Sequence, residues 1–177
     1  MGCQSSREAP KGNTCKERSA ISCSNKKIVQ DTWKSLFPDR EKIGIAIFMR
    51  LFEEVPEAKG LFYNFKDLYN KDEVFQGLHE LDHVATVMNE LGTCIELLDD
   101  INRFKNSAQG LGSTHKLVGV KSEHVVMFGK IIVELFAEHF KSSWTIENEN
   151  AWKEFFALLS DNFAIGLNVD NNNDNGK

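Results

Sequence analysis

Apolar residues recur at steps of three and four along most of the chain. This spacing places side chains on one face of an α-helix. The clearest stripes are Val29, Trp33 and Leu36; Ile43, Ile47 and Leu51; His83, Val87, Leu91 and Cys94; Ile101, Phe104, Ala108, Leu111 and His115; Val125, Phe128, Ile132, Leu135 and His139; and Trp152, Phe155, Leu159 and Phe163. No segment shows the strict alternation that is typical of a half-buried strand, so the pattern predicts an all-α fold.

Two prolines divide the first part of this pattern. Proline cannot continue a helix, but it suits a first helical turn. We therefore expect the first helix to stop at Pro38 and the second to run to Pro56, which opens a short new helix.

Length and composition predict one domain with two polar extensions. The chain has 177 residues, of which 41% are hydrophobic, enough for one substantial core. We place the domain at residues 24–168. Residues 1–23 and 169–177 have too little apolar surface to offset the entropy of ordering and are expected to be disordered. We expect neither a transmembrane helix nor a secretory signal, because no sufficiently long apolar run occurs.

Charge is distributed unevenly along the chain. Residues 1–27 contain six basic and two acidic residues, a net charge of +4, so the remainder carries −9 of the total −5. An acidic body argues against nucleic acid as a partner, whereas a basic arm suits an anionic membrane surface. The four cysteines, Cys3, Cys15, Cys23 and Cys94, form no C-x-x-C pair. They predict neither a disulfide framework nor a thiolate zinc site, and they fit a reducing cytosol.

His115 lies within the stretch LGSTHKLVGV, among small and apolar residues. Its helical stripe turns it inward. A single histidine on an apolar face is usually an ordinary core or capping residue, so its role depends on other residues at suitable distances.

The string HELDH at residues 79–83 matches the H-E-x-x-H pattern of zinc peptidases. On one helix, His79 and His83 would share a face, and Glu80 could activate a metal-bound water. Glu96 or Asp100 could supply a third ligand. The extended peptidase motif is missing from the sequence, and so is a strand to align a peptide, which makes this a minor alternative.

Four residues at mutually consistent distances resemble the haem pocket of the globin family. Phe62 follows Pro56 by six residues, His83 follows by twenty-one more, and His115 by a further thirty-two. Trp33 and Trp152 also stand where globins commonly carry tryptophan. The strings LDHVATVM and HKLVGV are most similar to those of neuroglobin and globin X, and the likeness covers residues 25–167.

The resemblance implies a globin fold of seven or eight helices around one haem b. It makes His115 the proximal ligand of the iron and puts His83 on the opposite side, as a second ligand when no gas is bound. Phe62 would pack against the porphyrin, and Phe48, Val87 and Val120 would line the cavity. The residue types suit these roles, because neutral imidazole binds iron well and a large macrocycle needs apolar walls. Without this spacing, the four apolar residues would be interpreted as ordinary core residues.

The opening MGCQSSR matches the pattern M-G-x-x-x-[ST] for myristoylation of Gly2, and Cys3 is placed for palmitoylation. One myristoyl chain binds a membrane only marginally, so stable attachment needs a second signal, which Cys3 and the basic arm would provide. Globin X is similar in carrying an acylated start. A Met-Gly start without modification is the alternative.

The expected function is that of a haem globin at the cytoplasmic face of a membrane, the plasma membrane in particular. Its small ligands would be O₂, NO, CO or nitrite, with an unknown reductase as protein partner. Six-coordinate iron favours redox or signalling over storage, because each incoming ligand must displace an imidazole. Nitrite reductase or NO dioxygenase chemistry would be a side activity. A plain oxygen carrier and a haem-free interaction module remain alternatives.

Overall fold

A computed structural model describes residues 21–169, and within that range the chain forms helices and no strand. The prediction of an all-α fold is confirmed. The helices are α1 (Cys23–Leu36), α2 (Arg40–Glu54), α3 (Pro56–Lys59), α4 (Lys71–His79), α5 (Asp82–Glu96), α6 (Ile101–Lys116), α7 (Ser122–Phe140) and α8 (Ile146–Asn168), with 3₁₀ turns η1 (Phe37–Asp39), η2 (Leu97–Asp99) and η3 (Lys141–Ser143). Most of the predicted arm and tail, residues 1–20 and 170–177, lies outside the described residues.

The helix ends follow the local chemistry of the sequence. Ser22 caps α1 by accepting a hydrogen bond from the amide of Asn25 at 3.1 Å. The helix ends at Leu36, and Pro38 lies in the 3₁₀ turn that follows. Pro56 occupies the first turn of α3, where its missing N–H costs nothing. Both proline predictions are therefore confirmed.

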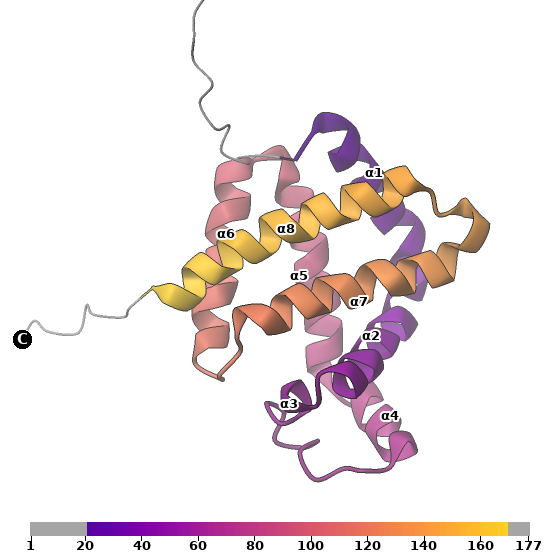
Figure 1. Cartoon of the computed structure of the whole chain (residues 1–177), viewed down its shortest axis with the longest axis vertical. Coiled ribbons are helices and arrows are strands. Elements are labelled where there is room, and N and C mark those ends of the chain that lie inside the picture. The colour runs from indigo at the N-terminus through magenta and orange to yellow at the C-terminus, as the bar shows by residue number, and fades with distance from the viewer. Residues whose placement is uncertain (1–20, 170–177) are drawn as a thin grey trace, which may run out of the picture.

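The long C-terminal helix α8 crosses the molecule and ties its parts together (Figure 1). It contacts α1, α6 and α7, while α2 contacts both α5 and α7. An aromatic core lies along α8, where Trp152 and Phe155 are fully buried. The ring of Phe136 on α7 meets Trp152 edge to face at 4.8 Å, so burial of large rings joins α7 to α8.

Helices α6 and α8 cross with their backbones in contact. A Cβ atom added to Gly112 would lie 2.1 Å from the carbonyl oxygen of Phe163, and one added to Gly166 would lie 2.0 Å from that of Gln109. Only glycine fits at such a close approach. We call this contact the Gly112–Gly166 seam. Because it falls one turn before His115, the seam fixes the end of α6 against α8.

The longest helices, α7 and α8, remain amphipathic rather than uniformly apolar. Charged residues such as Glu149 and Lys153 form an ion pair on the exposed side of α8. None of the helices in residues 21–169 is long and apolar enough to cross a bilayer.

Candidate functional site

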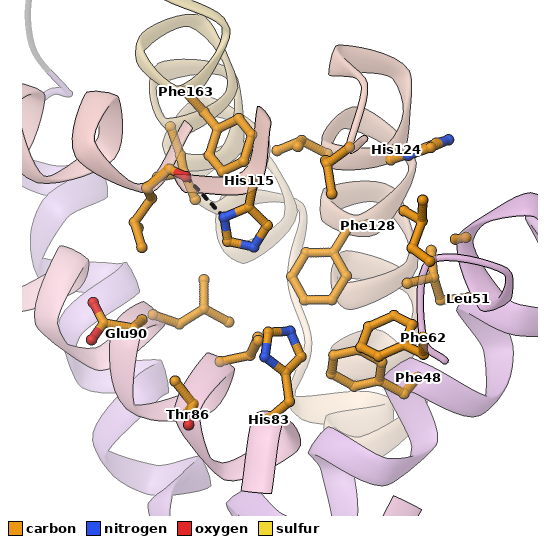
Figure 2. Close-up of a pocket in the computed structure, with 18 of the residues that line it drawn as sticks. Phe48, Leu51, Phe62, His83, Thr86, Glu90, His115, His124, Phe128 and Phe163 are labelled. Atoms are coloured by element: carbon orange, nitrogen blue, oxygen red, sulfur yellow. Dashed lines mark hydrogen bonds between the residues drawn. The ribbon is translucent and has the colours of Figure 1, made fainter. Parts of the chain in front are cut away.

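A cavity lies between α5 and α6, with further walls from α2, α3, α7 and α8 (Figure 2). Its lining is mostly aromatic and branched aliphatic. The six residues that sequence analysis assigned to a haem pocket all line it: Phe48, Phe62, His83, Val87, His115 and Val120. The structure therefore brings these residues together.

His115 is oriented by the backbone of its own helix. Its Nδ1 lies 2.8 Å from the carbonyl oxygen of Leu111, one turn earlier. A carbonyl only accepts hydrogen bonds, so Nδ1 carries the proton and donates it. The other ring nitrogen, Nε2, is then unprotonated in the neutral ring and has a lone pair to offer. This is the arrangement that metal-binding histidines use to fix their tautomer.

A ring from α8 supports His115 from the side. Phe163 lies 5.2 Å from it, centroid to centroid, just before the Gly112–Gly166 seam. Ser113 reinforces the seam by donating to the carbonyl oxygen of Gly166 at 3.2 Å. The imidazole is therefore held by a hydrogen bond, a ring contact and a close helix crossing.

His83 reaches the cavity from the first turn of α5, on the wall opposite His115 (Figure 2). Its ring packs against Phe62 at 5.4 Å and Phe48 at 5.9 Å, both edge to face. Burial lowers the pKa of His83 below its ordinary value, and the nearby His115 lowers it further. Its neutral form, the one that can bind a metal, is therefore favoured.

The separation of the two imidazoles suits a metal ion between them. The ring centroids of His83 and His115 are 6.4 Å apart. Two imidazoles that each place a nitrogen about 2 Å from one shared metal ion have ring centres roughly 6 Å apart. Apolar walls on both sides would remove a flat porphyrin from water. The cavity thus fits the haem that the sequence resemblance implies.

Sequence analysis missed several lining residues. Phe128 and Phe163 were assigned to ordinary core stripes, and Thr86 and Glu90 were not singled out at all. Phe128 comes from α7 and lies 6.1 Å from Phe48. The positions of Phe128 and Phe163 on inward-facing stripes were visible in the sequence. Periodicity alone does not distinguish a residue that lines a cavity from one that fills a core.

The structure argues against the zinc peptidase alternative. His79 is the last residue of α4 and His83 belongs to α5, so the HELDH string spans a helix break rather than one helical face. His79 instead contacts Phe75 at 4.8 Å, and its Nδ1 lies 3.9 Å from a carboxylate oxygen of Glu41. Within residues 21–169, no group of three or more His, Cys, Asp or Glu side chains could hold a metal ion.

Known proteins resemble this chain in sequence over most of its length. The family profile described as Globin matches residues 45–163. Cytoglobin-1 of Danio rerio is 28% identical over 134 residues, which cover 75% of this chain and 77% of that protein. Neuroglobin of Tetraodon nigroviridis is 25% identical over 146 residues, 82% of this chain and 92% of that one.

Two solved structures share the fold. A hexacoordinated heme protein from an anhydrobiotic tardigrade superposes with a TM-score of 0.77 at 19% identity, covering 86% of this chain and 98% of that one. The deoxy haemoglobin of Dasyatis akajei gives a TM-score of 0.67 at 22% identity, covering 81% and 96%. The eight-helix arrangement described above is thus that of known haem proteins.

Proposed function

The chain belongs to the globin family, and from this premise we propose that it binds one haem b in the cavity between α5 and α6, where His115 and His83 would hold the iron. The observation that carries the proposal is the 6.4 Å separation of the two rings across an apolar cavity. A bound haem iron would supply reversible binding of O₂, NO or CO and a one-electron ferric–ferrous couple.

The two histidines would do different work. His115, held by the carbonyl of Leu111, offers a fixed lone pair and anchors the cofactor. The imidazole of His83 makes no side-chain hydrogen bond within residues 21–169, and its neighbours Phe48 and Phe62 offer none. It can therefore move away from the cavity centre without breaking a protein hydrogen bond, and it is the ligand that an incoming gas would displace.

This arrangement favours redox or signalling chemistry over bulk oxygen storage. An entering gas competes with His83 for the iron. The apparent affinity for the gas is lowered by the fraction of time that the imidazole occupies the site. Electron exchange needs no such displacement. We therefore propose electron transfer, or NO and nitrite chemistry supported by a reductase, with a plain oxygen carrier as the competing function.

Absorbance spectra of variants test the cavity assignment. His115→Ala should lose stable haem and its intense Soret band, because the anchoring nitrogen is gone. His79→Ala is the matched control: it removes a histidine four residues from His83 but outside the cavity, and it should retain haem in full. A His115→Ala protein with wild-type haem content and spectrum would show that the assignment is wrong.

We also propose that the protein is tethered to the cytoplasmic face of a membrane through acylated Gly2 and Cys3. The support is the sequence MGCQSSR together with the net charge of +4 over residues 1–27. An acyl chain and basic residues act additively at an anionic surface. This attachment would place the haem domain next to membrane-bound electron donors.

Cell fractionation tests the attachment. Gly2→Ala should move the protein from the membrane fraction to the soluble one, since myristoylation requires Gly2. Cys3→Ser should weaken membrane binding less completely, because the first acyl chain and the basic arm remain. Haem content should be the same in all three proteins. Identical fractionation of wild type and Gly2→Ala would contradict the proposal.

A further inference from the structure

One carboxylate belongs to the wall of the haem cavity. Among the cavity-lining residues that the structure describes, Glu90 is the only Asp, Glu, Lys or Arg. It stands two turns after His83 on α5, with Thr86 between them on the same side of the helix (Figure 2). Glu90 is half-buried, so part of its charge faces protein rather than water.

The charge of Glu90 is not cancelled locally. It forms no ion pair with any residue from 21 to 169. Its field also reaches the cavity wall. The pKa of the buried thiol of Cys94, one turn further along α5, is raised to about 11, mainly by burial and secondly by the charge of Glu90. Cys94 lines the same cavity, so the charge of Glu90 acts on a neighbouring side chain of this wall.

We propose that Glu90 sets the redox balance of the haem by stabilising the ferric state. The inference rests on the proposed function, since it requires a haem in this cavity. Apart from its peripheral carboxylates, the iron–porphyrin unit carries one positive charge when ferric and none when ferrous. One electron enters on reduction and no proton need move, so the attraction to Glu90 is present only before the electron arrives. The carboxylate therefore opposes reduction of the ferric haem and makes the ferrous haem a stronger electron donor.

The size of the effect follows from the helix geometry. His83 and Glu90 are seven residues apart, which is about 10.5 Å along the axis of an α-helix. Taking this separation for the distance from the Glu90 carboxylate to the haem iron, two unit charges partly screened by water alter an equilibrium roughly threefold to tenfold. We therefore expect neutralising Glu90 to raise the ferrous-to-ferric ratio by that factor at a fixed applied potential.

Spectroelectrochemical titration of the haem-loaded protein with soluble mediators measures this ratio. Glu90→Gln should shift the midpoint to a more positive potential. Glu90→Asp keeps the charge, so its midpoint potential should lie near that of the wild type. Glu96→Gln is the matched control. It removes one negative charge from the exposed last residue of the same helix, away from the cavity, and should shift the midpoint much less.

A second variant tests the same idea in the opposite direction. Thr86 is exposed and lines the cavity one turn closer to His83. Thr86→Glu adds a carboxylate there and should make the midpoint more negative, even if Glu90→Gln proves too unstable to load.

The outcomes separate this inference from the function on which it depends. A wild-type protein without a Soret band would overturn both. A haem-loaded Glu90→Gln protein with a wild-type midpoint would overturn the role of Glu90 alone. A Glu96→Gln shift as large as that of Glu90→Gln would do the same, because net charge rather than position would then explain it.

Discussion

The two walls of the cavity hold their histidines in different ways. On the α6 wall, His115 follows the Gly112–Gly166 seam, donates to Leu111 and packs against Phe163. On the α5 wall, His83 lies in the first turn of a helix whose cap residue, Leu81, makes no side-chain cap hydrogen bond. Such a helix end is weaker than a capped one.

In the proposed haem site, this difference would let one residue type serve two roles. A ligand that must retain the cofactor needs a fixed orientation, and backbone contact between two long helices provides it. A ligand that must yield to a gas needs a bound and a displaced position of similar free energy. An uncapped first helical turn, in which the side chain makes only ring contacts, allows both positions. Variants of either wall can test this contrast.

The largest expected effect comes from breaking the α6 wall. Gly112→Ala introduces a Cβ 2.1 Å from the carbonyl oxygen of Phe163, and neither backbone can yield cheaply. We expect the free energy of unfolding to fall by about 3 kcal/mol. Haem retention should fall with it, because His115 lies one turn further on. Urea titration followed by Soret absorbance measures both.

Gly110→Ala provides the matched control on the same helix. A Cβ at Gly110 meets nothing within 4 Å, so only the intrinsic preference of alanine for helices applies. This change should stabilise the protein by about 0.5–1 kcal/mol and leave haem binding unaltered. Equal destabilisation by both alanines would mean that the seam is not what holds α6.

The next effect comes from emptying the α5 wall. His83→Leu should keep haem, since His115 remains, but the ferrous protein should change from sharp low-spin bands to a broad high-spin spectrum. CO should bind at least tenfold faster, because no internal ligand has to leave first. Flash photolysis measures the rate. If unliganded wild type is already high-spin, His83 is not an iron ligand, and the oxygen-carrier function gains ground.

The smallest effect concerns protons in the haem-free protein. The pKa of His83 is lowered in the folded state, so below its ordinary value of about 6.5 the unfolded chain binds a proton that the native one resists. The contribution of His83 should therefore make stability fall as pH drops from 7 towards 5. His83→Leu should show a shallower fall in urea titrations across this range. If the free energy of unfolding fell equally with pH in both proteins, the lowered pKa of His83 would be contradicted.

The long helices could be predicted from sequence because burial imposes a regular spacing. α4 was missed as a separate helix, since Val74 and Leu78 are its only buried residues. Its start carries a recognisable signal in Asn70, whose side chain accepts from the amide of Asp72 at 2.8 Å. Its end at His79 carries no such signal, because no Gly or Pro marks the break between His79 and His83.

The candidate site was predictable where several residues share a spacing, and not beyond. His83 and His115 were assigned together and do line one cavity. Their roles as ligands stay predictions. Glu90 was missed because a glutamate on an amphipathic helix ordinarily faces water, and only the packing of α5 shows that it borders a cavity. The Gly112–Gly166 seam was missed for a similar reason: it depends on how two distant helices cross.

That seam also bears on how the protein would acquire a cofactor. Gly112 and Gly166 bring the backbones of α6 and α8 into contact, and the ring contact of Phe104 with Phe155 lies in the core that joins these two helices. These contacts require no cofactor to complete them. The α6–α8 framework therefore needs no bound group to hold its shape, and we expect it to present His115 already oriented in the haem-free chain. In biosynthetic terms, a newly made polypeptide would offer the proposed haem a pre-shaped receptor on its α6 side.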